Sequence, residues 1–383
     1  MVIWRSGLLA ASETFIRNHG DALTEWRPTF VGATKVESYL AEDTDVIAYP
    51  DNARGRRAFL RLRLTGRSPR LRRVLTELRP AVIHAHFGGD GWLISQSTVQ
   101  LGIPLVVTVH GYDVTRQPNT PGLRGVRYRR NLRTVFDRAT LILAVSEFIR
   151  GKAIALGADP AKVRVHHLGV PVPPAPAAVP KKWDVIFVGR FVEKKGIDDL
   201  IEAIGMIHEP RPRTLLVGGG PLENLMRERA AEIGLDATFL GAQDPAVVSR
   251  CMAESRIFVA PSKTASNGET EGLPTTILEA ASLGLPTVST YHSGIPDAVV
   301  HEETGLLGKE GDRSSLAGSI RRLLTDDALR TRLGHQARRH VETHFDIRKQ
   351  THRLEELYEM VARGKGFSSP HRTGRRRSRE PLR

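Results

Sequence analysis

The sequence predicts an α/β protein made of two doubly wound, Rossmann-like domains that face each other across a cleft. Its 383 residues are enough for two domains with a core each. Short apolar runs alternate with helical patterns in both halves of the chain. Between the halves lies a proline-rich stretch at 169–180, which is typical of a stiff, extended linker. We therefore place the domains at 1–170 and 183–345, with a linker at 171–182.

In the N-terminal half, apolar runs rich in β-branched residues and bounded by turn residues predict buried parallel strands. These strands are 80–87, 104–110 and 139–146, and helices are predicted at 89–102 and 123–139. The first strand looks short, because only Val2, Ile3 and Trp4 precede Arg5. We expect either a minimal first strand or a chain start that lies further upstream.

The C-terminal half repeats the alternation after the linker. Strands are predicted at 183–190, 213–220, 237–241, 255–262 and 285–290, with helices at 196–208, 221–234, 244–254 and 274–284. Strands and helices in this order build parallel sheets, which bind ligands beyond the carboxyl ends of their strands. A last helix is predicted at 346–364, followed by a basic tail at 365–383 that is expected to be disordered.

The formal net charge of +14 is concentrated in two segments. Ten arginines lie from Arg54 to Arg79, where Glu77 is the only acid, and a second basic run follows Ser368. Such charge attracts nucleic acids, anionic membranes and phosphorylated substrates. The apolar residues that interleave with the first block are Phe59, Leu60, Leu62, Leu64, Leu71, Val74, Leu75 and Leu78. This block suits either a helix hairpin on an anionic membrane or a solvated helix face that packs its leucines on the core.

The remaining composition favours a soluble, cytoplasmic protein. No run approaches the roughly 18 apolar residues of a spanning helix, and the first residues are too polar for a secretory signal. The single cysteine, Cys251, excludes an intramolecular disulfide and suits a reducing compartment.

The segment 262–290 carries the strongest chemical signal. Glu271 and Glu279 would lie about 12 Å apart along one helix, which is too far for the carboxylate pair of a glycosidase. A better arrangement places Glu271 in the loop, Pro274 at the first helical position and Glu279 two turns into the helix. The free amides of Thr275 and Thr276 would then bind a phosphate, and the carboxylates would accept hydrogen bonds from vicinal hydroxyls.

Two further strand-to-helix turns could contact phosphate. Arg190 follows a strand, and Lys195 precedes the glycine that opens the next helix, so both cations could bind a diphosphate. We expect Lys194 to contribute less. Gly219 and Gly220 permit a close approach of the backbone to a ligand, although a tight turn explains them equally well.

The N-terminal half offers histidines at strand ends. His84, His86 and His110 end neighbouring strands, with Asp113 close behind, and could bond sugar hydroxyls or phosphate. A metal site fits less well, because no carboxylate or cysteine falls at ligand spacing. The loop of Ser12 and Glu13 serves either as a helix cap or as part of an acceptor site.

The segment ETEGLPTTILEA (269–280) resembles the E-x7-E signature of the family 4 retaining glycosyltransferases, which have the GT-B fold. Further C-terminal blocks are similar to that family and occur in its usual order: VGRFVEKKG, LLVGGGPL, FLGAQ, IFVAPS and SLGLPTVSTYHSGIPDAVV. SETFIRNH, HAHFG and TVHGYD resemble the branch that builds exopolysaccharides such as colanic acid and amylovoran. The resemblance extends from about Ser12 to about Gly364.

The resemblance implies that Arg190 and Lys195 bind the donor diphosphate, Glu279 the ribose and Glu271 the donor sugar, with His110 beside the reacting carbon. It implies retention of configuration, no metal and no cofactor, and a last helix that crosses back to the N-terminal domain. The expected partners are a UDP- or GDP-linked sugar donor and a glycan acceptor, lipid-linked at the inner face of the membrane. Where the family often has EGFG, this chain has Leu273 and Pro274, and the proline removes one amide donor.

Two other functions remain open. A further GT-B enzyme, such as a sugar-nucleotide epimerase or a glycosyl phosphorylase, would bind similar ligands. A nucleic-acid-binding protein would use the basic segments, but no aromatic-interleaved basic strand or helix-turn-helix spacing supports it, so we expect no specific nucleic acid partner.

Overall fold

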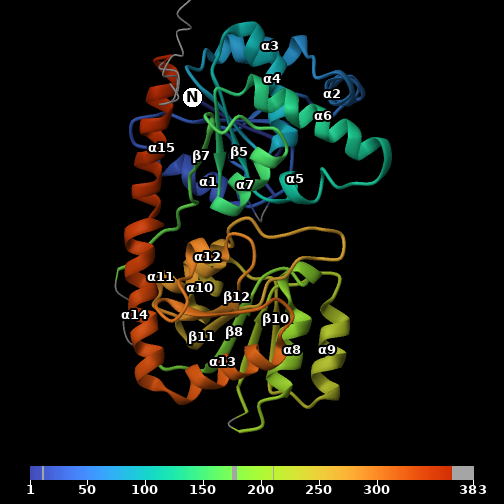
Figure 1. The fold of residues 1–383 in the computed structure, drawn as a ribbon. Coiled ribbons are helices and arrows are strands. Elements are labelled where there is room, and N and C mark those ends of the chain that lie inside the picture. Colours follow the sequence, from blue (N-terminus) through green and yellow to red (C-terminus); the bar gives the residue numbers. More distant parts are fainter. Residues whose placement is uncertain (11–12, 175–178, 210, 365–383) are drawn as a thin grey trace, which may run out of the picture.

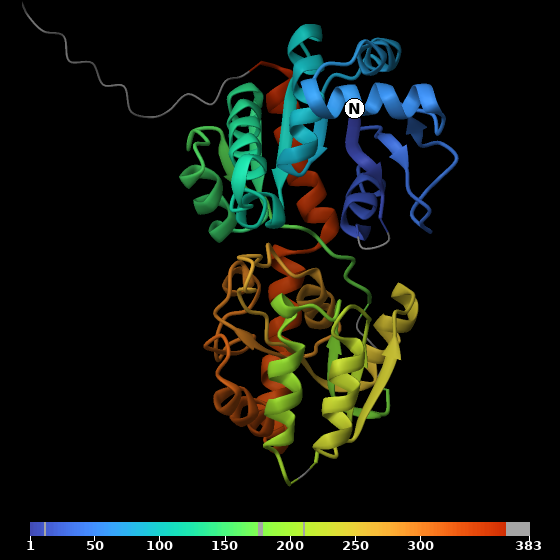
Figure 2. The ribbon, with the colours of Figure 1, turned by 90° about the vertical axis from the view of Figure 1, so that its right-hand side faces the viewer.

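The computed structural model describes residues 1–10, 13–174, 179–209 and 211–364, and the predicted tail at 365–383 lies outside them. The chain forms two parallel sheets, each flanked by helices, stacked one above the other (Figure 1). Rotation by 90° shows the same two layered units joined by crossing segments (Figure 2). The predicted pair of doubly wound domains is confirmed.

The N-terminal sheet has seven strands in the order β3-β2-β1-β4-β5-β6-β7. They are β1 Val2–Leu8, β2 Thr29–Lys35, β3 Val46–Ile47, β4 Ile83–His86, β5 Leu105–Val109, β6 Leu141–Ala144 and β7 Val163–Val165. Its helices are α1 Thr14–Asp21, α2 Ala53–Thr65, α3 Pro69–Leu78, α4 Gly88–Leu101, α5 Tyr112–Thr115, α6 Gly122–Arg138 and α7 Glu147–Ala155. Every residue of β4, β5 and β6 is buried, as predicted for these strands, and in β4 this includes His84 and His86.

The C-terminal sheet has six strands in the order β10-β9-β8-β11-β12-β13. They are β8 Trp183–Val188, β9 Thr214–Val217, β10 Ala237–Gly241, β11 Ser255–Ala260, β12 Thr287–Thr290 and β13 Gly305–Gly308. Its helices are α8 Ile197–Gly205, α9 Glu223–Glu232, α10 Pro245–Ala253, α11 Thr275–Ser282, α12 Ile295–Ala298, α13 Arg313–Thr325 and α14 Asp327–His344, with a short 3-10 helix at Glu193–Lys195.

In both sheets the strand order reverses beside the first strand, between β1 and β4 and between β8 and β11. The reversal leaves room at the carboxyl ends of these strands, where open α/β sheets bind ligands. The two reversal points are therefore the expected positions of ligand-binding sites.

The last helix, α15 (Ile347–Ala362), returns to the N-terminal domain as expected (Figure 1). His84 Nδ1 lies 2.6 Å from the Tyr358 hydroxyl, and the Glu355 carboxylate accepts the Thr24 amide at 2.7 Å. Where the chain crosses between domains, Val170 and Asp346 form an isolated parallel β-bridge. The domains are thus tied by two adjacent segments rather than by the linker alone.

Two expectations about element ends were wrong. The first strand is not minimal, because β1 continues through Arg5, Ser6 and Gly7 to Leu8. Pro274 is the N-cap of α11 rather than its first residue, which leaves Glu279 little more than one turn into the helix.

The basic block 54–79 forms the helix pair α2 and α3. Leu62, Leu71 and Leu75 are fully buried in the core, which agrees with helices that pack on the domain. Leu60 and Leu64 instead lie exposed beside the arginines. No helix in the described part of the chain combines the length and apolar character needed to cross a membrane.

Candidate active site

The loop from β11 to α11 holds Glu271 at the reversal point of the C-terminal sheet. Its amide donates to His292 Nε2 at 3.1 Å, and its carbonyl accepts the Ser293 hydroxyl. His292 Nδ1 lies 2.7 Å from Glu310. Because Nε2 accepts, Nδ1 carries the proton and donates it to Glu310. The buried Glu271 backbone is therefore fixed by groups from the end of β12.

Two lysines from the turn after β8 face the Glu271 carboxylate. Lys195 Nζ is 3.2 Å and Lys194 Nζ 3.8 Å from Glu271 Oε1, and Lys194 also pairs with Glu269 at 2.8 Å. Burial alone would raise the pKa of Glu271, but the ammonium groups of Lys195 and Lys194 outweigh it and hold the pKa below its usual value. Glu271 is thus an ionised, buried carboxylate.

The start of α11 presents unpaired backbone donors. The amides of Thr275 and Thr276 have no acceptor among the residues that the structure describes, since the first bond of the turn runs from Ile277 to Pro274. Glu279 lies one turn further on, and burial raises its pKa in spite of a hydrogen bond with Thr275 and the charge of Lys195. Two unbonded helix amides and a buried carboxylate thus lie within about one turn of each other at the start of α11.

Arg190 follows β8 with an exposed side chain and forms no ion pair within the described ranges. The neighbouring turn contains Gly219 and Gly220. A Cβ on Gly220 would lie 2.8 Å from the Phe191 carbonyl oxygen, at a φ of +152°. The contact between the two turns therefore requires glycine at 220, whether or not a ligand binds there.

His110, at the end of β5, lies where the two domains meet. A Cβ on Gly272 would come 1.7 Å from the His110 carbonyl oxygen, so the backbone after Glu271 touches the backbone of His110. The Ser146 hydroxyl bonds the Gly272 carbonyl oxygen at 3.1 Å across the same interface. The structure thus brings His110 next to the Glu271 loop from the opposite domain.

Behind His110 the histidines form a buried stack. His86 Nδ1 is 3.0 Å from His110 Nε2, and the His86 ring stacks on His84 with centroids 4.4 Å apart. Burial and the neighbouring histidines lower the pKa of both His86 and His110 well below the ordinary value. His110 is therefore a neutral imidazole, and His86 supports it from inside the domain.

The residues expected to bind an acceptor are largely used within the protein. Asp113 is wholly buried and accepts the amides of Gly88, His110 and Gly111, so it orders these turns and is not available to a ligand. Glu13 occupies the N-cap of α1 without capping it. Its carboxylate instead pairs with Arg5 at 2.6 Å. Ser12 lies outside the described residues.

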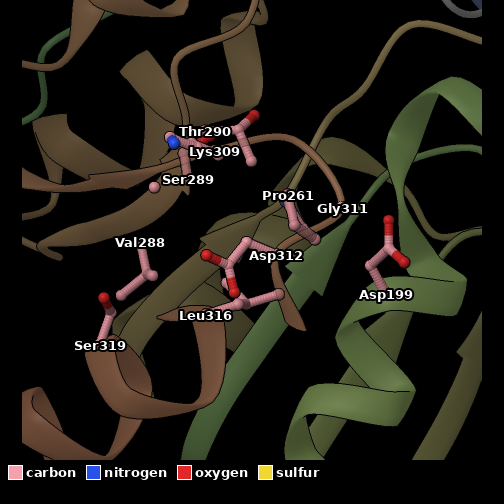
Figure 3. A pocket seen from close by; sticks show the side chains of 11 residues that line it. Asp199, Pro261, Val288, Ser289, Thr290, Lys309, Gly311, Asp312, Leu316 and Ser319 are labelled. Carbon is pink, nitrogen blue, oxygen red and sulfur yellow. The ribbon is translucent and has the colours of Figure 1, made fainter. Parts of the chain in front are cut away.

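A small cavity at the ends of β11, β12 and β13 is distinct from this site (Figure 3). Its volume is about 10 Å³, enough for one water molecule. Asp199, in its wall, already bonds Lys263 and Arg313. Within the described ranges, no group of three or more His, Cys, Asp or Glu side chains is arranged to hold a metal.

This architecture is that of GT-B glycosyltransferases. HepE of Anabaena, solved with UDP-glucose, superposes with a TM-score of 0.73 at 18% identity over 94% of this chain and 99% of that one. Sucrose-phosphate synthase of Thermosynechococcus elongatus gives 0.74 at 20% identity, over 95% and 99%. At these identities the likeness concerns the fold.

The sequence comparisons identify the family. Residues 13–172 match the family described as Glycosyltransferase Family 4, and residues 173–340 match Glycosyl transferases group 1. The chain therefore belongs to the family 4, group 1 glycosyltransferases, as its motifs predicted.

Two relatives come from exopolysaccharide synthesis. The amylovoran biosynthesis glycosyltransferase AmsK of Erwinia amylovora is 29% identical over 72% of this chain and 69% of its own length. The putative colanic acid biosynthesis glycosyltransferase WcaL of Escherichia coli K12 is 30% identical over 64% and 61%. The alignment with WcaL thus spans less than two thirds of that protein.

Proposed function

We propose that the chain transfers a hexose from a UDP- or GDP-linked donor to a glycan during the synthesis of a cell-surface polysaccharide. The observation that carries this proposal is the group formed by Lys195, Glu271 and the free amides at the start of α11. Fixed cations and helix amides suit a diphosphate, and an ionised carboxylate beside them suits sugar hydroxyls. The relationship to AmsK and WcaL supports the assignment to polysaccharide synthesis.

In this proposal Arg190, Lys195 and the amides of Thr275 and Thr276 bind the diphosphate, and Glu279 accepts the ribose hydroxyls. Negative charge develops on the departing phosphate as its bond to the sugar breaks. Donors already fixed around that phosphate lower the barrier without reorganisation.

We assign the reaction retention of configuration and independence from metal. The bond between the sugar carbon and the phosphate oxygen breaks, and the acceptor oxygen bonds the same face of that carbon. The leaving phosphate oxygen takes the acceptor proton, so a separate protein base is not needed. Neutral His110 can hydrogen-bond the donor sugar without placing a positive charge beside the reacting carbon.

A thermal-shift screen with UDP, GDP, ADP and their sugar conjugates tests the proposal. A ligand that binds only the folded state raises the unfolding midpoint, so one nucleotide is expected to stabilise the wild type and to stabilise Arg190→Ala less. Release of nucleoside diphosphate only when acceptor is present would exclude an epimerase. Stabilisation by a DNA duplex and by none of the nucleotides would refute the proposal.

A further inference from the structure

A pocket of about 680 Å³ opens at the carboxyl end of the N-terminal sheet, between α2, α4 and α6. Ser6 and Gly7, near the end of β1, and the first turn of α4, after β4, form part of its wall. This is the reversal point of the N-terminal sheet, the position equivalent to the proposed donor site in the other domain. The donor does not use this pocket in the proposed reaction.

The pocket is positively charged. Arg63, Arg124 and Arg127 line it, and none of them pairs with a carboxylate within the described part of the chain. The one acid in its wall, Asp90, is already bonded to Arg5. Guanidinium groups that have no carboxylate partner favour a phosphate or diphosphate.

The two helices that carry these arginines also expose apolar side chains. On α2, Leu60 and Leu64 line the pocket and are 53% and 58% exposed. On α6, Leu123 and Val126 flank Arg124 and are 87% and 54% exposed. The two helices are adjacent, because Arg127 donates to the carbonyl oxygens at the end of α2, one of them at 2.6 Å. Exposed apolar groups beside cations that have no carboxylate partner suit an anionic amphiphile.

The inner end of the pocket lies close to the proposed reaction centre. Gly88, in its wall, directly follows Phe87, whose ring packs against His110 with centroids 4.5 Å apart. A molecule held by the arginines can therefore direct its sugar toward His110 and the Glu271 loop.

We propose that this pocket binds the lipid-linked phosphate or diphosphate of the acceptor, with the phosphate on Arg63, Arg124 and Arg127 and the lipid along the exposed leucines. The inference rests on the proposed function, since it names the acceptor class of that reaction. It assigns a distinct role to pocket arginines that lie outside the donor site.

Farnesyl diphosphate is a suitable probe for this pocket, and its affinity can be measured by calorimetry in detergent. UDP or GDP, whichever binds, is present at a saturating concentration so that the donor site is filled. The wild type is expected to bind it, and Arg124→Gln/Arg127→Gln to bind at least tenfold more weakly. Arg124→Gln alone, which removes no internal contact, should weaken binding severalfold. Arg130→Gln is the matched control, because Arg130 is an exposed arginine of α6 outside the pocket wall. Farnesol is expected to bind weakly and with no dependence on the arginines.

Unchanged nucleotide affinity in these variants would show that they are folded and that the donor site is intact. Failure of every nucleotide to bind would reject the proposed function. Nucleotide binding without farnesyl diphosphate binding, or an equal loss in Arg130→Gln, would reject the pocket proposal alone. Loss of binding to phosphatidylglycerol vesicles with unchanged farnesyl diphosphate affinity would also overturn it, because the arginines would then serve a membrane surface.

Discussion

Replacement of His292 by leucine should slow turnover sharply while leaving the binding of the nucleotide largely intact. His292 accepts the buried Glu271 amide at 3.1 Å and donates to Glu310 at 2.7 Å. Leucine keeps a similar apolar bulk but can do neither. The Glu271 amide then has no acceptor, and the residue that carries the carboxylate keeps only the Ser293 bond to the segment after β12.

The expected loss of kcat follows from the buried Glu271 amide, which is left without an acceptor. A buried donor left without a partner costs about 1–3 kcal/mol, so the population of the productive loop should fall by roughly fivefold to 150-fold. We expect kcat for donor hydrolysis or transfer to fall within that range. The affinity for nucleoside diphosphate should change less than threefold, because Arg190 and Glu279 do not depend on this loop.

The measurement combines steady-state kinetics with calorimetric titration of the nucleotide identified in the thermal screen. Ser293→Ala, which removes the other side-chain bond to Glu271, is the natural comparison and should give a smaller loss. A His292→Leu enzyme with wild-type kcat would refute the positioning role. A parallel loss of nucleotide affinity and of thermal stability would show that His292 merely supports the fold.

Three further predictions concern charge. Glu279→Ala should weaken nucleotide binding at least tenfold. Because burial raises the pKa of Glu279, the nucleotide affinity of the wild type should fall on mild acidification. In binding titrations across pH, the affinity of Glu279→Gln should not show this fall. Arg190→Ala should lower kcat more than donor affinity, which single-turnover and binding measurements separate. Burial lowers the pKa of His19 to about 4. Below pH 6.5 the unfolded chain therefore binds a proton at this histidine that the folded chain does not bind, and about 3 kcal/mol of stability is lost as the pH falls toward 4. Urea titrations across pH should show a smaller loss for His19→Gln.

The sequence predicted the buried strands well and the ends of the strands poorly. β5 and β6 are apolar apart from one threonine, and this composition is typical of buried parallel strands. The apolar pattern predicts a shorter β1, because Arg5, Ser6 and Gly7 are not apolar. Those residues stand at a carboxyl strand end, where Arg5 pairs with Glu13 and Asp90, so the apolar pattern stops before the strand does.

The candidate site was predictable where its residues share one turn. Glu279 with Thr275 and Lys194 with Lys195 lie on single elements, so their spacing is informative. His292 could not be assigned to the site in the same way, because it meets Glu271 only once β11 and β12 are neighbours. Asp113 shows the opposite error: an acid at a strand end suggested a ligand contact, but nearby amides occupy its carboxylate.

The contact between the two domains explains why the parts of the site need one another. Gly272 meets His110 with no side chain between them, and the Gly272 carbonyl oxygen also accepts the Ser146 hydroxyl. A displacement of about 1 Å can cost a reaction about a hundredfold, and this contact leaves little room for one. The proposed donor groups at one sheet end and the proposed acceptor pocket at the other are therefore aligned by the same backbone contact, which lies at His110.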